Sequence, residues 1–158
     1  MMTLTARRPE RSESGPAVTR LLLVEDNPGD ARLIEEQLAD GLGDSCVLEA
    51  AGTLAEGLRR ARDRRPDLVL LDLGLPDASG LEALRAVRAV DPTPPVVVLT
   101  GLDDEERAVE ALGEGAQDYL VKGRLDPGSL RRAIRYGVER HRTVRELERT
   151  RREAEQHR

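Results

Sequence analysis

The sequence predicts an α/β fold in which a doubly wound, five-stranded parallel sheet, with strand order 2-1-3-4-5, carries helices on both faces. Two observations support this fold class. From residue 20 onward, short apolar runs alternate with longer amphipathic segments, as in chains built from strand–helix–strand units. The apolar runs are also unbroken, which is typical of strands that are buried on both faces of a parallel sheet. The order 2-1-3-4-5 is a common one for such sheets.

Five segments have the composition expected of these strands. They span residues 20–25, 46–51, 67–72, 95–100 and 118–123, with the sequences RLLLVE, CVLEAA, DLVLLD, PVVVLT and DYLVKG. The only cysteine, Cys46, begins the second segment, so we expect it to be a buried strand residue rather than a reactive thiol. A chain with a single cysteine forms no internal disulfide, which fits a reducing cytosol.

Signals for a helix start follow the strands. They are Asn27 with Pro28, the capping-box patterns Thr53–Glu56 and Ser79–Glu82, Asp103, and Asp126 with Pro127. Asn, Ser, Thr and Asp are favoured at helix N-caps because their side chains accept hydrogen bonds from the free amides of the first turn. Proline is favoured directly after the cap. These signals predict five helices that alternate with the five strands.

The last of these helices is expected to continue beyond the domain. It should bury Leu130, Ala133, Ile134 and Val138 against the sheet. After residue 140 the apolar positions thin to an incomplete heptad seam, formed by Val144, Leu147 and Ala154. No Pro or Gly interrupts residues 138–158, and a helix that continues a packed one avoids a new nucleation cost. We therefore expect one helix from about Ser129 to beyond Leu147, which serves as a connector or a weak homodimer seam.

Composition divides the chain into three expected parts: a disordered lead-in over residues 1–18, a domain over residues 19–140 and a helical extension over residues 141–158. The lead-in lacks the apolar middle of a secretory signal, and no apolar run approaches the roughly 20 residues of a membrane span. The net charge is −5, and the chain has no Phe or Trp. The sequence therefore lacks both the basic stripe and the stacking aromatic residues that favour direct contact with nucleic acid. These features predict a cytoplasmic protein without a membrane partner.

Polar residues collect at the carboxyl ends of the predicted strands, the edge at which open parallel sheets bind ligands. Glu25 and Asp26 follow the first strand, and Asp72 ends the third. Thr100 ends the fourth strand, and Lys122 lies at the end of the fifth. Because the first and third strands are neighbours in this order, the three carboxylates should meet at the centre, beside a hydroxyl and an ammonium.

Three adjacent carboxylates need a cation. Two of them at roughly 4 Å repel by about 4 kcal/mol at an effective dielectric of about 20, and Mg²⁺ prefers carboxylate oxygens with room for water. Such a metal can take phosphate oxygens as further ligands, which makes Asp72 a candidate nucleophile toward phosphorus. Lys122, the only lysine beside 24 arginines, would balance the phosphoryl charge of about −1.5 to −2 where a guanidinium is too broad. Thr100 would donate a hydrogen bond to the same group.

Each of these residues, taken singly, has a simpler structural interpretation. Asp72 can begin a turn, and Thr100 can cap one. Glu25 and Asp26 can be charges at a helix start, and Lys122 can be a solvated surface charge. Their joint occurrence at four of the five predicted strand ends favours a binding site.

In these residues the sequence resembles the receiver domains of bacterial two-component response regulators, which have a flavodoxin-like fold. The matching segments are LLLVEDNPGD, LVLLDLGLPDASG, VVVLTG and GAQDYLVKG. The resemblance implies that Asp72 is the phosphoacceptor and that a histidine kinase or a phosphotransfer protein is the donor. It implies that Asp26, Asp72 and the backbone carbonyl of Gly74 ligate Mg²⁺, with Glu25 acting through water. It also implies that the protein is no enzyme for a separate substrate, but acquires and hydrolyses its own phosphoryl group.

The resemblance gives roles to three further residues and reveals one departure. Thr100 and Lys122 would bind the phosphoryl group, and Tyr119 matches the family's aromatic switch, which turns inward when the threonine moves. From its strand position alone, Tyr119 is a half-buried strand residue. The family has a cis-bonded proline after the lysine, whereas Gly123 follows here. A cis bond to a residue other than proline costs about 2.5–4 kcal/mol, which favours a trans bond and a more mobile loop, but the sequence leaves the isomer open.

Three other functions share this architecture. A flavodoxin-like cofactor binder needs a first loop that donates to phosphate, whereas EDNPGD at residues 25–30 would repel one. A phosphohydrolase with an aspartyl nucleophile is expected to place a DxD pair after one strand, and here the acids are split between two. A receiver fold that serves only as an unphosphorylated interaction module usually lacks one of the five site residues. The sequence leaves open the output, the cognate kinase and its signal, the oligomeric state and the lifetime of the phosphoryl group.

Overall fold

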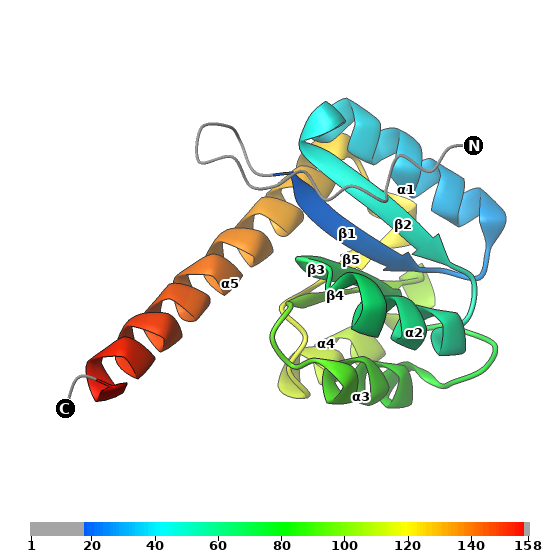
Figure 1. The fold of residues 1–158 in the computed structure, drawn as a ribbon. Helices are drawn as coiled ribbons and strands as arrows, with labels where there is room; N and C mark the ends of the chain where they lie inside the picture. Colours follow the sequence, from blue (N-terminus) through cyan, green and yellow to red (C-terminus); the bar gives the residue numbers. More distant parts are fainter. Residues whose placement is uncertain (1–17, 157–158) are drawn as a thin grey trace.

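The predicted strands form one parallel sheet in the computed structural model of the protein, which describes residues 18–156 (Figure 1). The strands are β1 (Thr19–Val24), β2 (Cys46–Ala51), β3 (Leu68–Asp72), β4 (Val96–Thr100) and β5 (Asp118–Val121). Their order is β2-β1-β3-β4-β5, and all neighbouring strands run parallel. The predicted sheet order is therefore confirmed.

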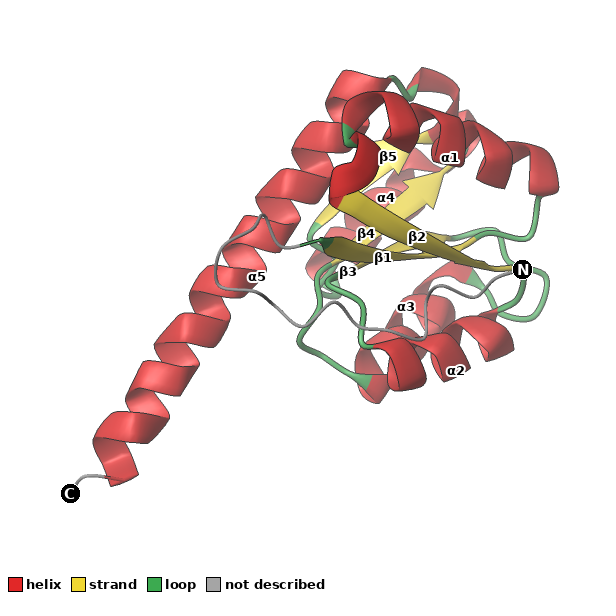
Figure 2. Cartoon of the chain, turned by 45° about the horizontal axis from the view of Figure 1, so that its top comes forward, coloured by secondary structure: helices red, strands yellow, loops and turns green. Residues whose placement is uncertain are grey.

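Five α-helices of the described chain connect these strands and cover both faces of the sheet. They are α1 (Pro28–Gly41), α2 (Leu54–Arg64), α3 (Gly80–Val90), α4 (Glu105–Gly113) and α5 (Pro127–Gln156). Helices α1 and α5 pack on one face, and α2, α3 and α4 pack on the other (Figure 2). Successive residues of β1 alternate between the two cores, since Leu21 and Leu23 belong to the first and Leu22 and Val24 to the second. This explains why the apolar runs are unbroken.

Burial on both faces holds for the central strands and fails at the edges. Every residue of β3 and β4 is buried, whereas Ala51 is the one buried residue of β2. Cys46, which begins β2, is half-buried, so the expectation of a buried cysteine was wrong. An edge strand has a neighbour on one side only, which leaves its ends partly open to solvent. Burial nevertheless raises the pKa of the Cys46 thiol, which disfavours a reactive thiolate.

Three of the predicted N-caps form the expected hydrogen bonds. The side chain of Asn27 accepts from the amide of Asp30 at 3.1 Å, and that of Thr53 from the amide of Glu56 at 3.2 Å. At the start of α5, Oδ1 of Asp126 accepts from the amide of Ser129 at 2.8 Å. These local bonds fix where α1, α2 and α5 leave the carboxyl edge of the sheet.

Two predicted caps are wrong in detail. Ser79 occupies the N-cap position of α3, but its side chain makes no capping hydrogen bond. Asp103 lies within a short 3₁₀ turn, Leu102–Asp104, and α4 begins only at Glu105. The chain takes this extra turn between β4 and α4, so the residue at the start of α4 is not the one that the sequence pattern indicates.

Helix α5 is a single 30-residue helix. Its first half buries the four predicted side chains, Leu130, Ala133, Ile134 and Val138. Gly137 permits the close approach to the sheet, because a Cβ at this position would lie 2.9 Å from Cδ1 of Leu68. His141 is the last buried residue, and residues 142–156 are exposed. The orange-to-red end of the helix accordingly projects away from the domain (Figure 1).

The expected lead-in over residues 1–18 lies, apart from Val18, outside the described residues. Within residues 18–156, none of the helices combines the length and the apolar character that a membrane crossing requires.

Candidate functional site

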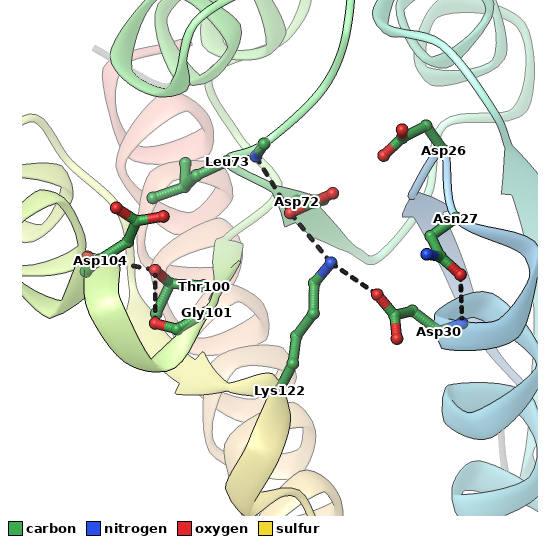
Figure 3. Close-up of a pocket in the computed structure, with 10 residues that line it drawn as sticks. Asp26, Asn27, Asp30, Asp72, Leu73, Thr100, Gly101, Asp104 and Lys122 are labelled. Atoms are coloured by element: carbon green, nitrogen blue, oxygen red, sulfur yellow. Dashed lines mark hydrogen bonds and ion pairs between the residues drawn. The ribbon is translucent and has the colours of Figure 1, made fainter.

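Four of the five polar residues predicted at the strand ends line one cavity at the carboxyl edge of the sheet (Figure 3). The fifth, Glu25, is buried and contacts the lining residue Lys122. The volume of the cavity is about 400 Å³. It is lined by Asp26, Asn27, Asp30, Asp72, Leu73, Gly74, Thr100, Gly101, Asp104 and Lys122. The β1–β3 and β3–β4 pairings bring the ends of these strands side by side, which places residues from distant parts of the sequence around one opening.

The three predicted acids converge. Glu25, Asp26 and Asp72 each offer one carboxylate oxygen, and these oxygens lie within 4.8 Å of one another. Glu25 and Asp72 are buried, whereas Asp26 is exposed. Buried like charges at this separation repel one another strongly unless a cation offsets them.

Lys122 supplies one such cation from the end of β5. Its Nζ lies 2.6 Å from Oε1 of Glu25 and 3.3 Å from Oδ1 of Asp72. Burial alone lowers the pKa of this ammonium, but its close contacts with the carboxylates of Glu25 and Asp30 and the charge of Asp72 outweigh that effect, so the pKa is raised above its usual value. Lys122 is therefore charged throughout the physiological range.

A fourth acid, Asp30, contacts the same ammonium and was not among the predicted site residues. Its Oδ2 accepts a hydrogen bond from Nζ of Lys122 at 3.1 Å. In Figure 3 the ammonium stands between Asp72 and Asp30. The sequence did contain a signal, because the cap at Asn27 places residue 30 in the first turn of α1, at the same edge of the sheet.

Glu25 has the most strongly perturbed carboxyl group of the cluster. Burial first, and then the neighbouring Asp72, raise its pKa to about 7, against the opposing effects of Lys122 and the amide of Asn27. Its Oε2 accepts from the amide of Asn27 at 3.2 Å. Its buried Oε1 makes an ion pair with Lys122 but has no hydrogen bond of good geometry within the described residues.

The residues present fit a magnesium ion. Mg²⁺ takes oxygen ligands and is usually held by one or two carboxylates together with water, and the cluster offers three carboxylates, one of them exposed. Their combined negative charge exceeds the single positive charge of Lys122, which contacts Glu25 and Asp72, so a further cation would be stabilised there. Gly74 lies beside the cluster, since its amide donates to Oδ1 of Asp72 at 3.1 Å.

Gly74 also leaves one side of Asp72 open, because glycine has no side chain. A Cβ at this position would lie 3.7 Å from Oδ1 of Asp72. Because glycine has no such atom, the side of Asp72 that faces the loop is bare backbone, and Gly74 is exposed. A group approaching Asp72 from solvent therefore meets no side chain at this position.

Neither Thr100 nor Tyr119 forms a hydrogen bond with the three acids within the described residues. The Thr100 hydroxyl donates to the carbonyl of Asp104 at 3.1 Å and has a longer contact, 3.4 Å, with that of Gly101. It is thus bonded to the loop that follows β4 and not to Asp72. Tyr119 is half-buried and packs against the core on the α2–α4 face. Its half-buried position agrees with the expectation from the strand pattern.

The link between Lys122 and Gly123 is trans, since residues 18–156 contain no cis peptide bond. Lys122 begins a 3₁₀ turn that runs to Arg124 and leads into α5. The isomer of this bond, which the sequence leaves open, is therefore trans.

Comparison with known proteins gives this geometry a family. Residues 21–135 match the model of the response regulator receiver domain. The chain is 39% identical over 124 residues to the KDP operon transcriptional regulatory protein KdpE of Escherichia coli, which covers 78% of this chain and 53% of that protein. It is 36% identical over 120 residues to the transcriptional regulatory protein AfsQ1 of Streptomyces coelicolor, which covers 74% of this chain and 52% of that protein.

Solved structures agree. A response regulator receiver domain protein from Clostridium thermocellum superposes with a TM-score of 0.73 at 27% identity, covering 80% of this chain and 99% of that one. The receiver domain of a LuxO repressor protein from Vibrio parahaemolyticus gives 0.73 at 26% identity, with 83% and 98% covered. The chain spans about half the length of KdpE and AfsQ1. The described domain, with its acids, threonine and lysine at the strand ends, belongs to the receiver domains of two-component response regulators.

Proposed function

We propose that the protein takes a phosphoryl group onto Asp72, with Mg²⁺, from a histidine kinase or a phosphotransfer protein. The observation that supports this proposal most directly is the set of groups that surround the Asp72 carboxylate. This carboxylate is buried, lies 3.3 Å from the ammonium of Lys122, and joins two further acids within 4.8 Å. No side chain covers this carboxylate on the side of Gly74. A nucleophile, a charge-balancing cation and a metal-ligand set thus occupy one cavity.

The reaction follows from these positions. A carboxylate oxygen of Asp72 attacks the phosphorus of a phosphohistidine, the P–N bond breaks with its electron pair leaving on the imidazole, and an acyl phosphate forms on the aspartate. Bound Mg²⁺, held by Asp26, Asp72 and the carbonyl of Gly74 with Glu25 acting through water, would neutralise charge on the transferring group. Lys122 donates from its ammonium to a phosphoryl oxygen, which carries a share of a charge of about −1.5 to −2.

Thr100 connects this chemistry to a change of shape. To donate to the phosphoryl group, its hydroxyl must give up the hydrogen bonds to the carbonyls of Asp104 and Gly101. The loop before α4 then loses an anchor, and Tyr119, which packs on the same face of the sheet as α4, turns inward. We propose this displacement as the switch.

The signal would leave through α5 or through the face around α4. The projecting part of α5, with Val144 and Leu147 exposed, serves in this proposal as a connector to a partner or a downstream output domain, or as a weak homodimer seam. Residues 19–140 would be the receiver domain and residues 141–158 its helical extension. We place the protein in the cytoplasm, without direct contact to nucleic acid or membrane.

The decisive experiment is phosphorylation by a small acyl phosphate in the presence of Mg²⁺, followed by intact mass measurement. The wild type should gain one phosphoryl group that is labile to base and hydroxylamine, and Asp72→Asn should gain none. Asp103→Asn, which changes an exposed acid outside the cavity lining, is the matched control. A full adduct in Asp72→Asn would place the acceptor elsewhere. Turnover of an external phosphoester would instead identify an enzyme, whereas we expect self-phosphorylation and self-dephosphorylation only.

A further inference from the structure

We infer that Asp30 is a positioning residue, which holds the ammonium of Lys122 in the unphosphorylated protein and competes for it with the phosphoryl group. The inference rests on the proposed phosphorylation of Asp72. It concerns a contact that joins α1 to the end of β5 across 92 residues of sequence.

The start of α1 explains why Asp30 is available for this contact. Asp30 is the third helical residue after the cap Asn27, a position from which an acid often accepts a hydrogen bond from the amide of the cap. Here that amide donates to Oε2 of Glu25 instead, at 3.2 Å. The amide of Asp30 is itself held by Oδ1 of Asn27, at 3.1 Å. The backbone of Asp30 is thus fixed while its carboxylate remains free to reach Lys122.

Asp30 differs from the other two acids that contact Lys122. Glu25 and Asp72 belong to the cluster of oxygens within 4.8 Å, and Asp30 does not. Those two side chains are almost fully buried, whereas the side chain of Asp30 is 39% exposed. Asp30 also provides the one contact to Nζ that has full hydrogen-bond geometry, at 3.1 Å. It therefore holds the ammonium from outside the cluster to which the metal and the phosphoryl group are assigned.

The contact between Asp30 and Lys122 is weak enough for a phosphoryl group to displace Asp30 from the ammonium. Exposed ion pairs typically change an equilibrium constant by a factor of about two to five, and both partners here are partly accessible to water. A phosphoryl group, with its charge of about −1.5 to −2 and three acceptor oxygens, binds an ammonium more strongly. Lys122 can consequently transfer from Asp30 to the phosphoryl group, and Asp30 sets how readily this transfer occurs.

The test compares Asp30→Asn with Asp104→Asn. Both substitutions remove one negative charge from the lining of the same cavity. The side chain of Asp104, however, makes no hydrogen bond or ion pair in the described part of the chain. Beryllofluoride with Mg²⁺ serves as the phosphoryl mimic, and its affinity is measured for the wild type and both variants. We expect Asp30→Asn to bind it about two- to fivefold more tightly than Asp104→Asn does.

A second readout follows the contact itself. Because the chain has one lysine, selective ¹⁵N-lysine labelling gives a single Nζ signal, and its relaxation reports the mobility of this ammonium without any phosphoryl mimic. Asp30→Asn should increase that mobility and Asp104→Asn should not, with Asp30→Ser as a second variant should asparagine disturb the start of α1.

Equal affinities in the two variants, or unchanged Nζ mobility in Asp30→Asn, would overturn the inference and leave the proposed function standing. A wild type that neither binds beryllofluoride nor forms an acyl phosphate would overturn the proposed function and this inference together.

Discussion

Asp77 is hydrogen-bonded to the first turn of α2, since its Oδ1 accepts from the amide of Leu54 at 2.9 Å and its Oδ2 from the amide of Ala55 at 3.1 Å. Asp77 lies in the loop that leads from Asp72 to α3, so this loop is tied to α2, which packs on the same face of the sheet as α3. Together with Thr53, Asp77 satisfies amides that would otherwise lack partners at the helix start. The position of the loop beside Asp72 therefore depends on α2.

The first prediction concerns Asp77→Ala, which should lower the melting temperature at neutral pH. The hydrogen bond from Leu54 lowers the pKa of Asp77 below its ordinary 3.8. A depressed pKa contributes stability above the unfolded-state value, and this stability is lost as the pH falls through the folded-state value. The gap in melting temperature between wild type and variant should therefore narrow once the pH is well below 3.8. An equal gap at both pH values would show that the carboxylate charge plays no part.

The second prediction concerns pH and Mg²⁺. The pKa of Glu25 is raised from 4.5 to about 7 by burial and by Asp72, so the metal-free folded protein binds an extra proton between these values. Its stability should fall as the pH rises through this window. Mg²⁺ needs the ionised carboxylate, so its affinity should rise through pH 7 with release of a proton.

Calorimetric Mg²⁺ titrations in buffers of different ionisation enthalpy measure that proton release. In Glu25→Gln the pH dependence should flatten, while Glu35→Gln, which changes an exposed acid on α1, should keep it. A Mg²⁺ affinity that is constant across the window in the wild type would contradict the assignment of Glu25 to the metal site.

The third prediction concerns Lys122→Arg, which preserves the charge. Nζ of Lys122 is within 3.3 Å of oxygens from Glu25, Asp30 and Asp72, and a planar guanidinium is too broad to meet all three from one point. Loss of a charge-assisted hydrogen bond costs about 1.5–3 kcal/mol, so we expect the affinity for beryllofluoride to fall about ten- to a hundredfold. Arg124→Lys, on the exposed neighbouring turn, is the reverse control. A normal phosphorylation-dependent response in Lys122→Arg would make the single lysine a coincidence.

The fourth prediction concerns Arg65, the residue that ends α2. Its φ of 45° and ψ of 68° lie in the left-handed region, which costs a residue with a Cβ about 1 kcal/mol or more. Arg65 is exposed and makes no ion pair within the described chain. Arg65→Gly should therefore raise the free energy of unfolding by about 0.5–1 kcal/mol. Chemical denaturation measures this change, and a destabilised variant would contradict it.

Local patterns predicted most of the fold and five of the residues around the cavity. Strand ends can be predicted because an apolar run and the polar residue that ends it are adjacent in sequence, as at Asp72 and Thr100. The contact of Asp30 with Lys122 cannot be predicted in this way, because the two residues are 92 positions apart. It depends on the direction in which α1 leaves β1 relative to β5. The same holds for Asp77 with Leu54. The caps expected at Ser79 and Asp103 failed because a pattern identifies a possible donor–acceptor pair and not the loop geometry that joins it.

The last prediction tests where α5 stops contributing to the domain. Ile134 is almost completely buried in the core beside α1, whereas Leu147, 13 residues further along the same helix, is 67% exposed. Ile134→Ala removes buried methyl groups and should cost about 2–5 kcal/mol of unfolding free energy. Leu147→Ala makes a similar truncation on the projecting segment and should change it by less than about 0.5 kcal/mol. Denaturation of both variants at low protein concentration, where a weak dimer is dissociated, gives the two values.

The projecting segment should nevertheless be helical, because it continues a packed helix without a new nucleation step. Residues 142–150 are all exposed, so their amides should exchange faster than those of residues 130–141 but more slowly than in an unfolded peptide. If Leu147 lies in a dimer seam, Leu147→Ala should accelerate this exchange at high protein concentration and leave it unchanged at low concentration. Exchange at the unfolded rate throughout residues 142–150, at every concentration and with or without phosphorylation, would show that the extension is not a helix. A continuous helix could then not carry a signal from Asp72 through this segment.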